Sequence, residues 1–79
     1  MELTYDPKYN IAYICLRSKK SEVESIKISE ELIVDIGSDG TVYGIEFLNA
    51  NEQIRREGQE EFVIYNKLSG KKLSVPLPV

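Results

Sequence analysis

Four residues in the middle of the chain have the types and spacing of a calcium-binding loop. In the stretch VDIGSDGTVYGIE, Asp35, Asp39, Gly40 and Glu46 fit the first, fifth, sixth and last positions of the EF-hand pattern. Gly37 stands at the third position, where the pattern requires an oxygen ligand. An EF-hand also needs a helix on each side of its loop, and both flanking segments here are β-type. The pattern therefore favours a different local structure.

The same stretch is typical of a β-hairpin. Asp39-Gly40 is a preferred two-residue type I′ loop when it separates two apolar runs. The pairs then expected to face each other are Ser38–Thr41, Ile36–Tyr43, Val34–Ile45 and Leu32–Phe47. The six apolar residues of these pairs fall on one face, and a slip of one residue would break that set. We predict a hairpin with one apolar face.

The opposite face of this hairpin carries two carboxylates. Asp35 faces Gly44 in the predicted register, and Glu46 lies diagonal to Asp35. Such a pair could bind a cation or do acid–base work, with Asp6 or Asp39 as further candidates, if burial separates the pKa values. The alternative is a solvated or partly covered polar face. The apolar residues on this face suggest cover by the helix, the C-terminal hairpin or a second subunit; they are Ile33, Val42 and Leu48.

The usual catalytic set is missing from the sequence. The chain has no histidine, which removes the commonest general base and transition-metal ligand. Cys15, the single cysteine, sits in an apolar run without a base and is expected to be a buried core thiol. We therefore predict no catalytic residue, no cofactor and no metal, with Asp35, Asp39 and Glu46 as the metal candidates to test.

The length and net charge of the chain limit the classes of protein to which it can belong. At 79 residues the chain is expected to form a single domain, 1–79, with a modest core. Its net charge of −3 argues against nucleic acid as a partner. The start MELTYDPKYN does not resemble a signal peptide, and no apolar stretch approaches the length of a membrane span. We expect a cytoplasmic protein.

Short β-type runs separated by turns make up most of the chain. The expected strands are 1–5, 11–16, 23–28, 32–36, 41–48, 62–65 and 73–75. A short helix is expected in 49–58, with Asn49 or Asn51 as the N-cap and Gly58 at its end. Gly70 is the expected left-handed residue of the last turn, and the PLPV tail fits an edge or an extended segment. We predict an α+β fold, an antiparallel β-meander of about four to six short strands with one short helix.

Two segments resemble a known family. YDPKYNIAYICL and SEELIVDIGSDGTVYGIEFLNAN resemble the small prokaryotic domain of unknown function 2283 family, whose members typically read Y-D-x-x-x-D-A-L-Y-I-x-L and V-D-x-D-x-x-G-x-V-x-G-I-E-I-L-x-A. The resemblance covers about 3–54 and leaves the C-terminal hairpin and tail, 60–79, outside. Asn10 and Gly37 stand where aspartate is usual. The resemblance implies a compact β-sheet with a helical element and no established activity. Some relatives are encoded beside nuclease-like toxins, which implies an antitoxin-like role.

These observations favour a non-enzymatic protein-binding module, acting as an antitoxin-like or regulatory partner. A small core and two partly apolar sheet faces indicate a homodimer or a small protein partner. The residues expected at the interface are Ile33, Val42, Leu48, Tyr13 and Phe62. The alternative is a small cation-binding protein or carboxylate-based enzyme that uses Asp35 and Glu46.

Overall fold

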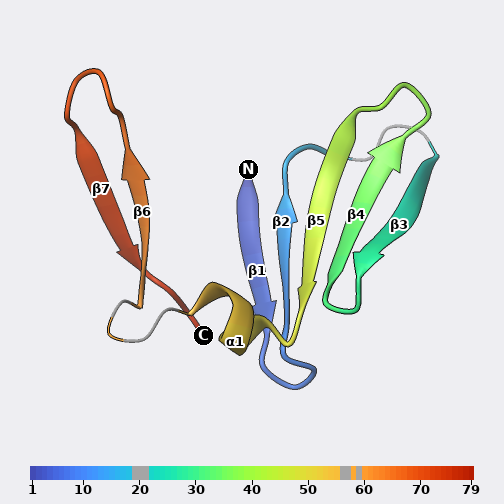
Figure 1. The fold of residues 1–79 in the computed structure, drawn as a ribbon, viewed down its shortest axis with the longest axis horizontal. Coiled ribbons are helices and arrows are strands. Elements are labelled where there is room, and N and C mark those ends of the chain that lie inside the picture. Colours follow the sequence, from blue (N-terminus) through green and yellow to red (C-terminus); the bar gives the residue numbers. More distant parts are fainter. Residues whose placement is uncertain (19–21, 56–57, 59) are drawn as a thin grey trace.

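The computed structural model describes residues 1–18, 22–55, 58 and 60–79, which form seven strands and one short helix (Figure 1). In chain order the elements are β1 (Glu2–Asp6), β2 (Ile11–Cys15), β3 (Val23–Ser29), β4 (Leu32–Gly37), β5 (Val42–Leu48), α1 (Ala50–Ile54), β6 (Glu61–Tyr65) and β7 (Lys72–Pro76). All seven segments expected to be strands are strands, with ends that shift by about a residue, as is usual for strand boundaries. Five of them form the larger sheet, which fits the predicted sheet of about four to six strands. No helix in the described part of the chain is long and apolar enough to cross a membrane.

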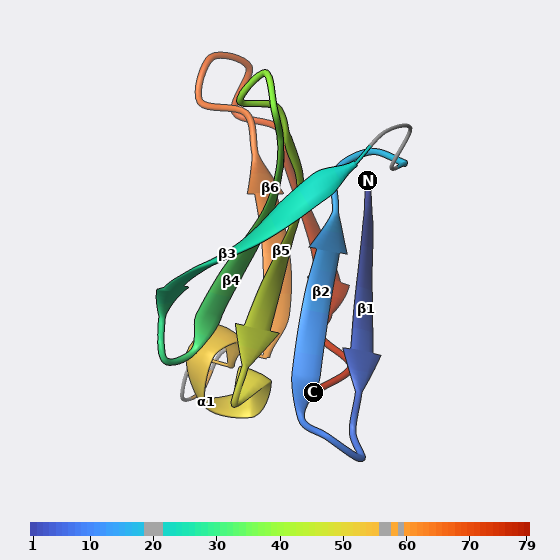
Figure 2. The same cartoon turned by 90° about the vertical axis from the view of Figure 1, so that its right-hand side faces the viewer.

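The strands form two separate antiparallel sheets. Five strands lie in the order β1-β2-β5-β4-β3, and β6 pairs with β7 alone. The predicted meander is therefore right for β3, β4 and β5 but wrong for β2, which hydrogen-bonds to β5. The β6–β7 hairpin, hereafter the arm, stands beside the five-stranded sheet as a separate wing, and the view along the sheet shows its twist (Figures 1 and 2).

The β4–β5 hairpin has the predicted register over most of its length. Leu32 pairs with Phe47, Val34 with Ile45, and Asp35 with Gly44. The apolar and polar residues therefore separate onto opposite faces, because side chains alternate along a strand.

The turn of this hairpin differs from the predicted two-residue loop. The Gly37 N–H donates to the Thr41 carbonyl oxygen at 2.8 Å, and the Gly40 N–H donates to the Gly37 carbonyl oxygen at 3.0 Å. Three residues, Ser38 to Gly40, thus form the loop, and Gly40 takes the left-handed conformation with φ 86°. Asp39 Oδ1 accepts the Thr41 N–H at 2.9 Å. This arrangement is the three-residue loop that also favours glycine at its last position.

The predicted strand pairing next to the turn is wrong because β5 has a β-bulge at Tyr43. Ile36 pairs with Val42 and not with Tyr43, because the register shifts between Asp35 and Ile36. The Tyr43 ring instead lies against Gly37, where an added Cβ would meet its Cε2 atom at 3.0 Å. Gly37 shares the face of Asp35 by alternation. Val42 and Tyr43 have therefore exchanged the faces predicted for them.

The helix is shorter than predicted. It ends at Ile54, and Arg55 is already extended, so the expected end at Gly58 is wrong. Asn49 holds the N-cap position, but with φ 51° and without a side-chain capping hydrogen bond. The predicted left-handed Gly70 is confirmed, with φ 76°. The tail follows the arm's edge, where the Leu77 N–H donates to the Glu60 carbonyl oxygen at 2.8 Å.

The chain buries little apolar surface on its own. Among the described residues Ala12 and Ala50 are the buried apolar side chains, and no large side chain is fully buried. The radius of gyration is 14.2 Å, whereas a compact domain of this length is expected near about 11.6 Å. The arm and the sheet thus lack a shared core.

Candidate protein-interaction site

A polar cluster ties three strands together on one face of the sheet. Tyr13 of β2 donates its hydroxyl to Asp35 Oδ2 of β4 at 2.8 Å, and Ser25 of β3 donates to Asp35 Oδ1 at 2.6 Å. Asp35 is 7% exposed. A buried carboxylate needs such donors, because its desolvation is otherwise strongly unfavourable. We call the face with these residues the polar face.

Gly44 makes this cluster possible. It lies in β5, between the strands of Tyr13 and Asp35. A Cβ added there would overlap the Tyr13 hydroxyl and ring and would come within 3.0 Å of the Ile14 carbonyl oxygen. Glycine is therefore the residue that lets the Tyr13 ring cross β5.

The pKa of the Tyr13 phenol reflects this position. Burial is the largest cause that raises the pKa, from 10.0 to about 12, followed by the hydrogen bond to Asp35 and the negative charge of Asp35. Cys15 and Glu46 add smaller contributions of the same sign. Tyr13 is thus held as a neutral hydrogen-bond donor and is poorly suited to act as a base at neutral pH.

The three metal candidates do not converge on one position. Asp35 and Glu46 share the polar face, as predicted, because Asp35 pairs with Gly44 and Glu46 pairs with Ile33. Asp39 lies in the exposed turn, where the hydrogen bonds from Thr41 lower the pKa of its carboxyl. Within residues 1–18, 22–55, 58 and 60–79, no group of three or more Cys, Asp or Glu side chains is placed to hold a metal ion.

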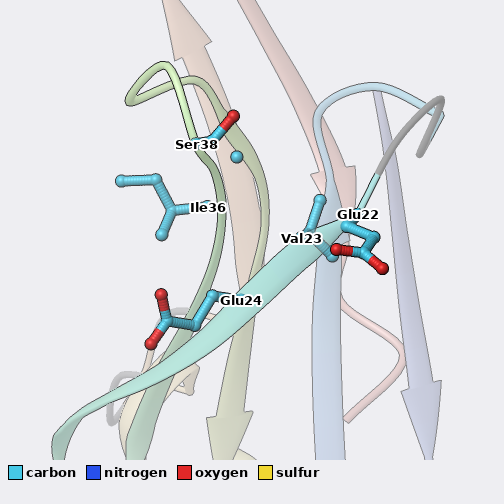
Figure 3. Close-up of a pocket in the computed structure, with 6 residues that line it drawn as sticks. Glu22, Val23, Glu24, Ile36 and Ser38 are labelled. Carbon is cyan, nitrogen blue, oxygen red and sulfur yellow. The ribbon is translucent and has the colours of Figure 1, made fainter.

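A shallow hollow at one end of the sheet is lined by two glutamates. Glu22 precedes β3 and Glu24 is its second residue, whereas Ile36 lies near the end of β4 and Ser38 in the turn that follows it (Figure 3). Its volume is about 210 Å³. Glu24 pairs with Ile36 and so points to the face opposite Asp35. The hollow thus adds negative charge at the edge of the other face.

That other face is apolar and only half-buried. It carries residues from all five strands of the sheet, including Leu3, Ile14, Val34, Ile45, Phe47 and Ile26. Ile26 is 39% exposed. We call this surface the apolar face. Monomeric proteins rarely leave so continuous an apolar surface open, which is typical of an interaction site.

The arm presents a second apolar surface. The register places Phe62 beside Val75 and Ile64 beside Leu73 on one side of the hairpin. These four side chains are between 41% and 60% exposed. An isolated two-stranded hairpin is marginally stable in water, so this side needs cover. Phe62, Met1, Leu3 and Ile14 line a hollow of about 190 Å³ where the arm approaches the apolar face.

The five predicted interface residues are divided among these surfaces. Tyr13, Ile33 and Leu48 lie on the polar face and are half-buried. Val42 lies opposite Ile36 on the apolar face, because of the bulge at Tyr43. Phe62 lies on the apolar side of the arm. Cys15 is half-buried, and its Sγ contacts the Arg17 carbonyl oxygen at 3.5 Å.

Asn10 has a structural role that the sequence analysis did not identify. Its Oδ1 accepts the Asn51 N–H at 3.0 Å, and its carbonyl oxygen accepts the Ala50 N–H at 2.9 Å. Its Nδ2 donates to Asn51 Oδ1 at 2.6 Å, and Tyr5 donates to its Oδ1 at 3.0 Å. Asn10 therefore supplies the cap of α1 from a distant loop.

The fold defines a small antiparallel β domain with a capped helical turn, a polar cross-strand cluster and an exposed C-terminal arm. The chain belongs to the family described as protein of unknown function (DUF2283), whose profile matches residues 2–51. This match contains the five-stranded sheet and the start of α1 and leaves the arm outside. Comparison of the chain with curated proteins and with solved structures found no match.

Proposed function

We propose that the chain is a non-enzymatic protein-binding module that acts as an antitoxin-like or regulatory partner. The observation that carries the proposal is the lack of a shared core: the apolar face and the apolar side of the arm both lie open. Burial of apolar surface is the main driving force for folding and association, so these surfaces favour a protein partner. The proposal includes a cytoplasmic setting, because a single thiol needs no oxidising compartment.

The polar face supports a structural role for the acidic residues. The Tyr13 and Ser25 hydroxyls satisfy both oxygens of Asp35 within the sheet. The geometry thus favours Asp35 as a tie between strands.

The carboxylate alternative rests on the shared face of Asp35 and Glu46. A calorimetric titration of the full chain with calcium, magnesium and manganese, repeated on Asp35→Asn, tests it. Heat that disappears in the variant would support a cation site. No heat with any of the three ions would retire the alternative.

Co-expression with the products of neighbouring genes tests the main proposal. We expect the full chain to co-purify with a partner in a fixed stoichiometry, measured by native mass spectrometry. Leu73→Asp should weaken this complex, because it places a charge on the apolar side of the arm. Leu68→Asp is the matched control, since Leu68 lies in the arm's turn and is 98% exposed. A chain that binds neither another protein nor itself would overturn the proposal.

A further inference from the structure

We propose that the partner of the arm is a second copy of this chain: the arm of each copy packs on the apolar face of the other in a symmetric dimer. The inference rests on the proposed function, since it names the occupant of the same open surfaces. Three observations point to a second copy, namely the exposed area, the match between two apolar surfaces of one chain, and the separation of charge along the sequence.

The exposed area is larger than a monomer of this size should have. The accessible surface is 6229 Å² for a chain of 9.0 kDa. The size scaling for folded monomers gives about 4,850 Å², so roughly 1,400 Å² is in excess. Obligate dimers bury on the order of 1,000–2,500 Å² per subunit. The excess therefore corresponds to one dimer interface.

The two open apolar surfaces belong to the same chain. A symmetric dimer uses each of them twice, because the arm of one copy covers the sheet of the other and the reverse. The arm approaches its own sheet at the hollow between Phe62 and Leu3. The side chains on the arm's apolar side are nevertheless between 41% and 60% exposed, so its own sheet covers little of them. In such a dimer the arm of each copy would cover the apolar face of the other, so both surfaces would be covered without any further protein.

Charge separates along the chain in a complementary way. Residues 62–79 carry three lysines and no Asp or Glu, a net side-chain charge of +3. Residues 1–61 carry the other seven basic residues and all 13 acidic ones, a net charge of −6. The Glu22 and Glu24 hollow adjoins the apolar face and offers carboxylates to the lysines of an incoming arm. Opposite charges so placed favour the encounter of arm and sheet from different copies.

The lysines involved lie near the tip of the arm. Lys67 and Lys71 lie between β6 and β7, and Lys72 begins β7. They thus lie at one end of the apolar side formed by Phe62, Ile64, Leu73 and Val75. The arm thus has an apolar centre and a basic end, which match the apolar face and its acidic edge.

Native mass spectrometry and isotope-mixed cross-linking of the unaltered chain test this inference. We expect a dimer, and carbodiimide coupling of a mixture of ¹⁴N and ¹⁵N chains should join an arm lysine of one isotope to a carboxylate of residues 1–61 of the other. Leu73→Asp should raise the dimer dissociation constant by about tenfold or more, since buried apolar anchors dominate interfaces. Leu68→Asp should change it by less than about twofold.

Each contrary result has a distinct meaning. A monomer, or arm-to-sheet links within one isotope only, would show that the arm folds on its own sheet and overturn the inference. A dimer that Leu73→Asp leaves unchanged would also overturn it, because the arm would then lie outside the interface. A monomer that still co-purifies with a different protein would overturn the dimer but leave the proposed function standing.

Discussion

The Tyr13 hydroxyl reaches Asp35 from two strands away and donates a 2.8 Å hydrogen bond across Gly44 of the strand between them. Three residue types depend on one another here: a phenol long enough to cross a strand, a glycine that leaves room, and a carboxylate that accepts. The cluster joins β2, β4 and, through Ser25, β3. It therefore holds together strands that are not all neighbours in the sheet.

Gly44→Ala should destabilise the fold, because the new methyl group would overlap the Tyr13 ring. We expect the free energy of unfolding to fall by about 1–3 kcal/mol, as for other overpacked sites. Urea unfolding followed by circular dichroism measures the change. In a Tyr13→Ala background the same substitution should be less unfavourable by at least about 1 kcal/mol, since contacting residues couple. An equal penalty in both backgrounds would show that Tyr13 does not fill this space.

Tyr13→Phe keeps the ring and removes the donor to Asp35. Hydrogen bonds to charged groups contribute more than neutral ones, so we expect a loss of about 1.5–3 kcal/mol at neutral pH. Tyr9→Phe is the matched control, because Tyr9 is 64% exposed, and it should change stability by less than about 0.5 kcal/mol. Similar losses in the two variants would contradict a specific role for the Tyr13 hydroxyl.

The contribution of Tyr13 should disappear at alkaline pH. Its pKa is raised from 10.0 to about 12 in the folded chain, mainly by burial and then by Asp35. The folded state therefore binds the phenol proton more tightly than the unfolded state, and stability falls as the pH rises between these two values. The difference in free energy of unfolding between the unaltered chain and Tyr13→Phe should be constant from neutral pH to pH 10 and shrink toward pH 12. A difference that stays constant through this range would contradict the raised pKa.

Local sequence patterns predicted the strands and much of the β4–β5 register. The alternation of apolar residues and the Asp39-Gly40 pair are local signals that relate residues close together in the sequence. The register of two strands joined by a short turn depends on such signals, and most of it was predicted correctly. The loop length was wrong because a three-residue loop also places glycine in the left-handed conformation. The Tyr43 bulge was missed because tyrosine suits either face of a half-buried strand.

Features that join distant parts of the chain could not be read from such patterns. The pairing of β2 with β5 and the cap from Asn10 to Asn51 both depend on tertiary arrangement. The carboxylates Asp35 and Glu46 were correctly placed on one face, but the two hydroxyls that donate to Asp35, those of Tyr13 and Ser25, come from other strands. The sequence therefore placed the acidic residues without showing what they contact.

Gly40→Ala tests the left-handed conformation of the last residue in the β4–β5 turn. Gly40 has φ 86°, a conformation in which a Cβ is unfavourable by about 1–2 kcal/mol. We expect Gly40→Ala to lower the thermal midpoint, and Gly40→Asn to lower it less, because asparagine tolerates left-handed backbone better. Apart from its two neighbours in the chain, no residue has an atom within 4 Å of the added Cβ, so crowding does not contribute. Equal midpoints for the two variants would argue against a left-handed residue at this position.

Substitutions of Asn10 should separate the cap of α1 from backbone strain. Asn10→Ala removes the acceptor for the Asn51 N–H and also places a Cβ at φ 56°, where alanine is unfavourable. Asn10→Gly removes the same side chain without that strain. We expect a loss of about 1 kcal/mol for glycine, as for other lost hydrogen bonds, and a larger loss for alanine.

Asn10→Asp should fall between glycine and the unaltered chain. Aspartate retains an acceptor for the Asn51 N–H but loses the Nδ2 donor to Asn51 Oδ1, and its carboxylate would then face that oxygen. Amide hydrogen exchange at Asn51 measures the cap itself, because a loss of global stability alone would speed exchange throughout the chain and not at Asn51 in particular. Exchange should be fastest in the glycine and alanine variants and slower in Asn10→Asp. If Asn51 exchanges equally in all three variants, another group must cap the helix, because the aspartate carboxylate is the one side-chain acceptor that distinguishes them.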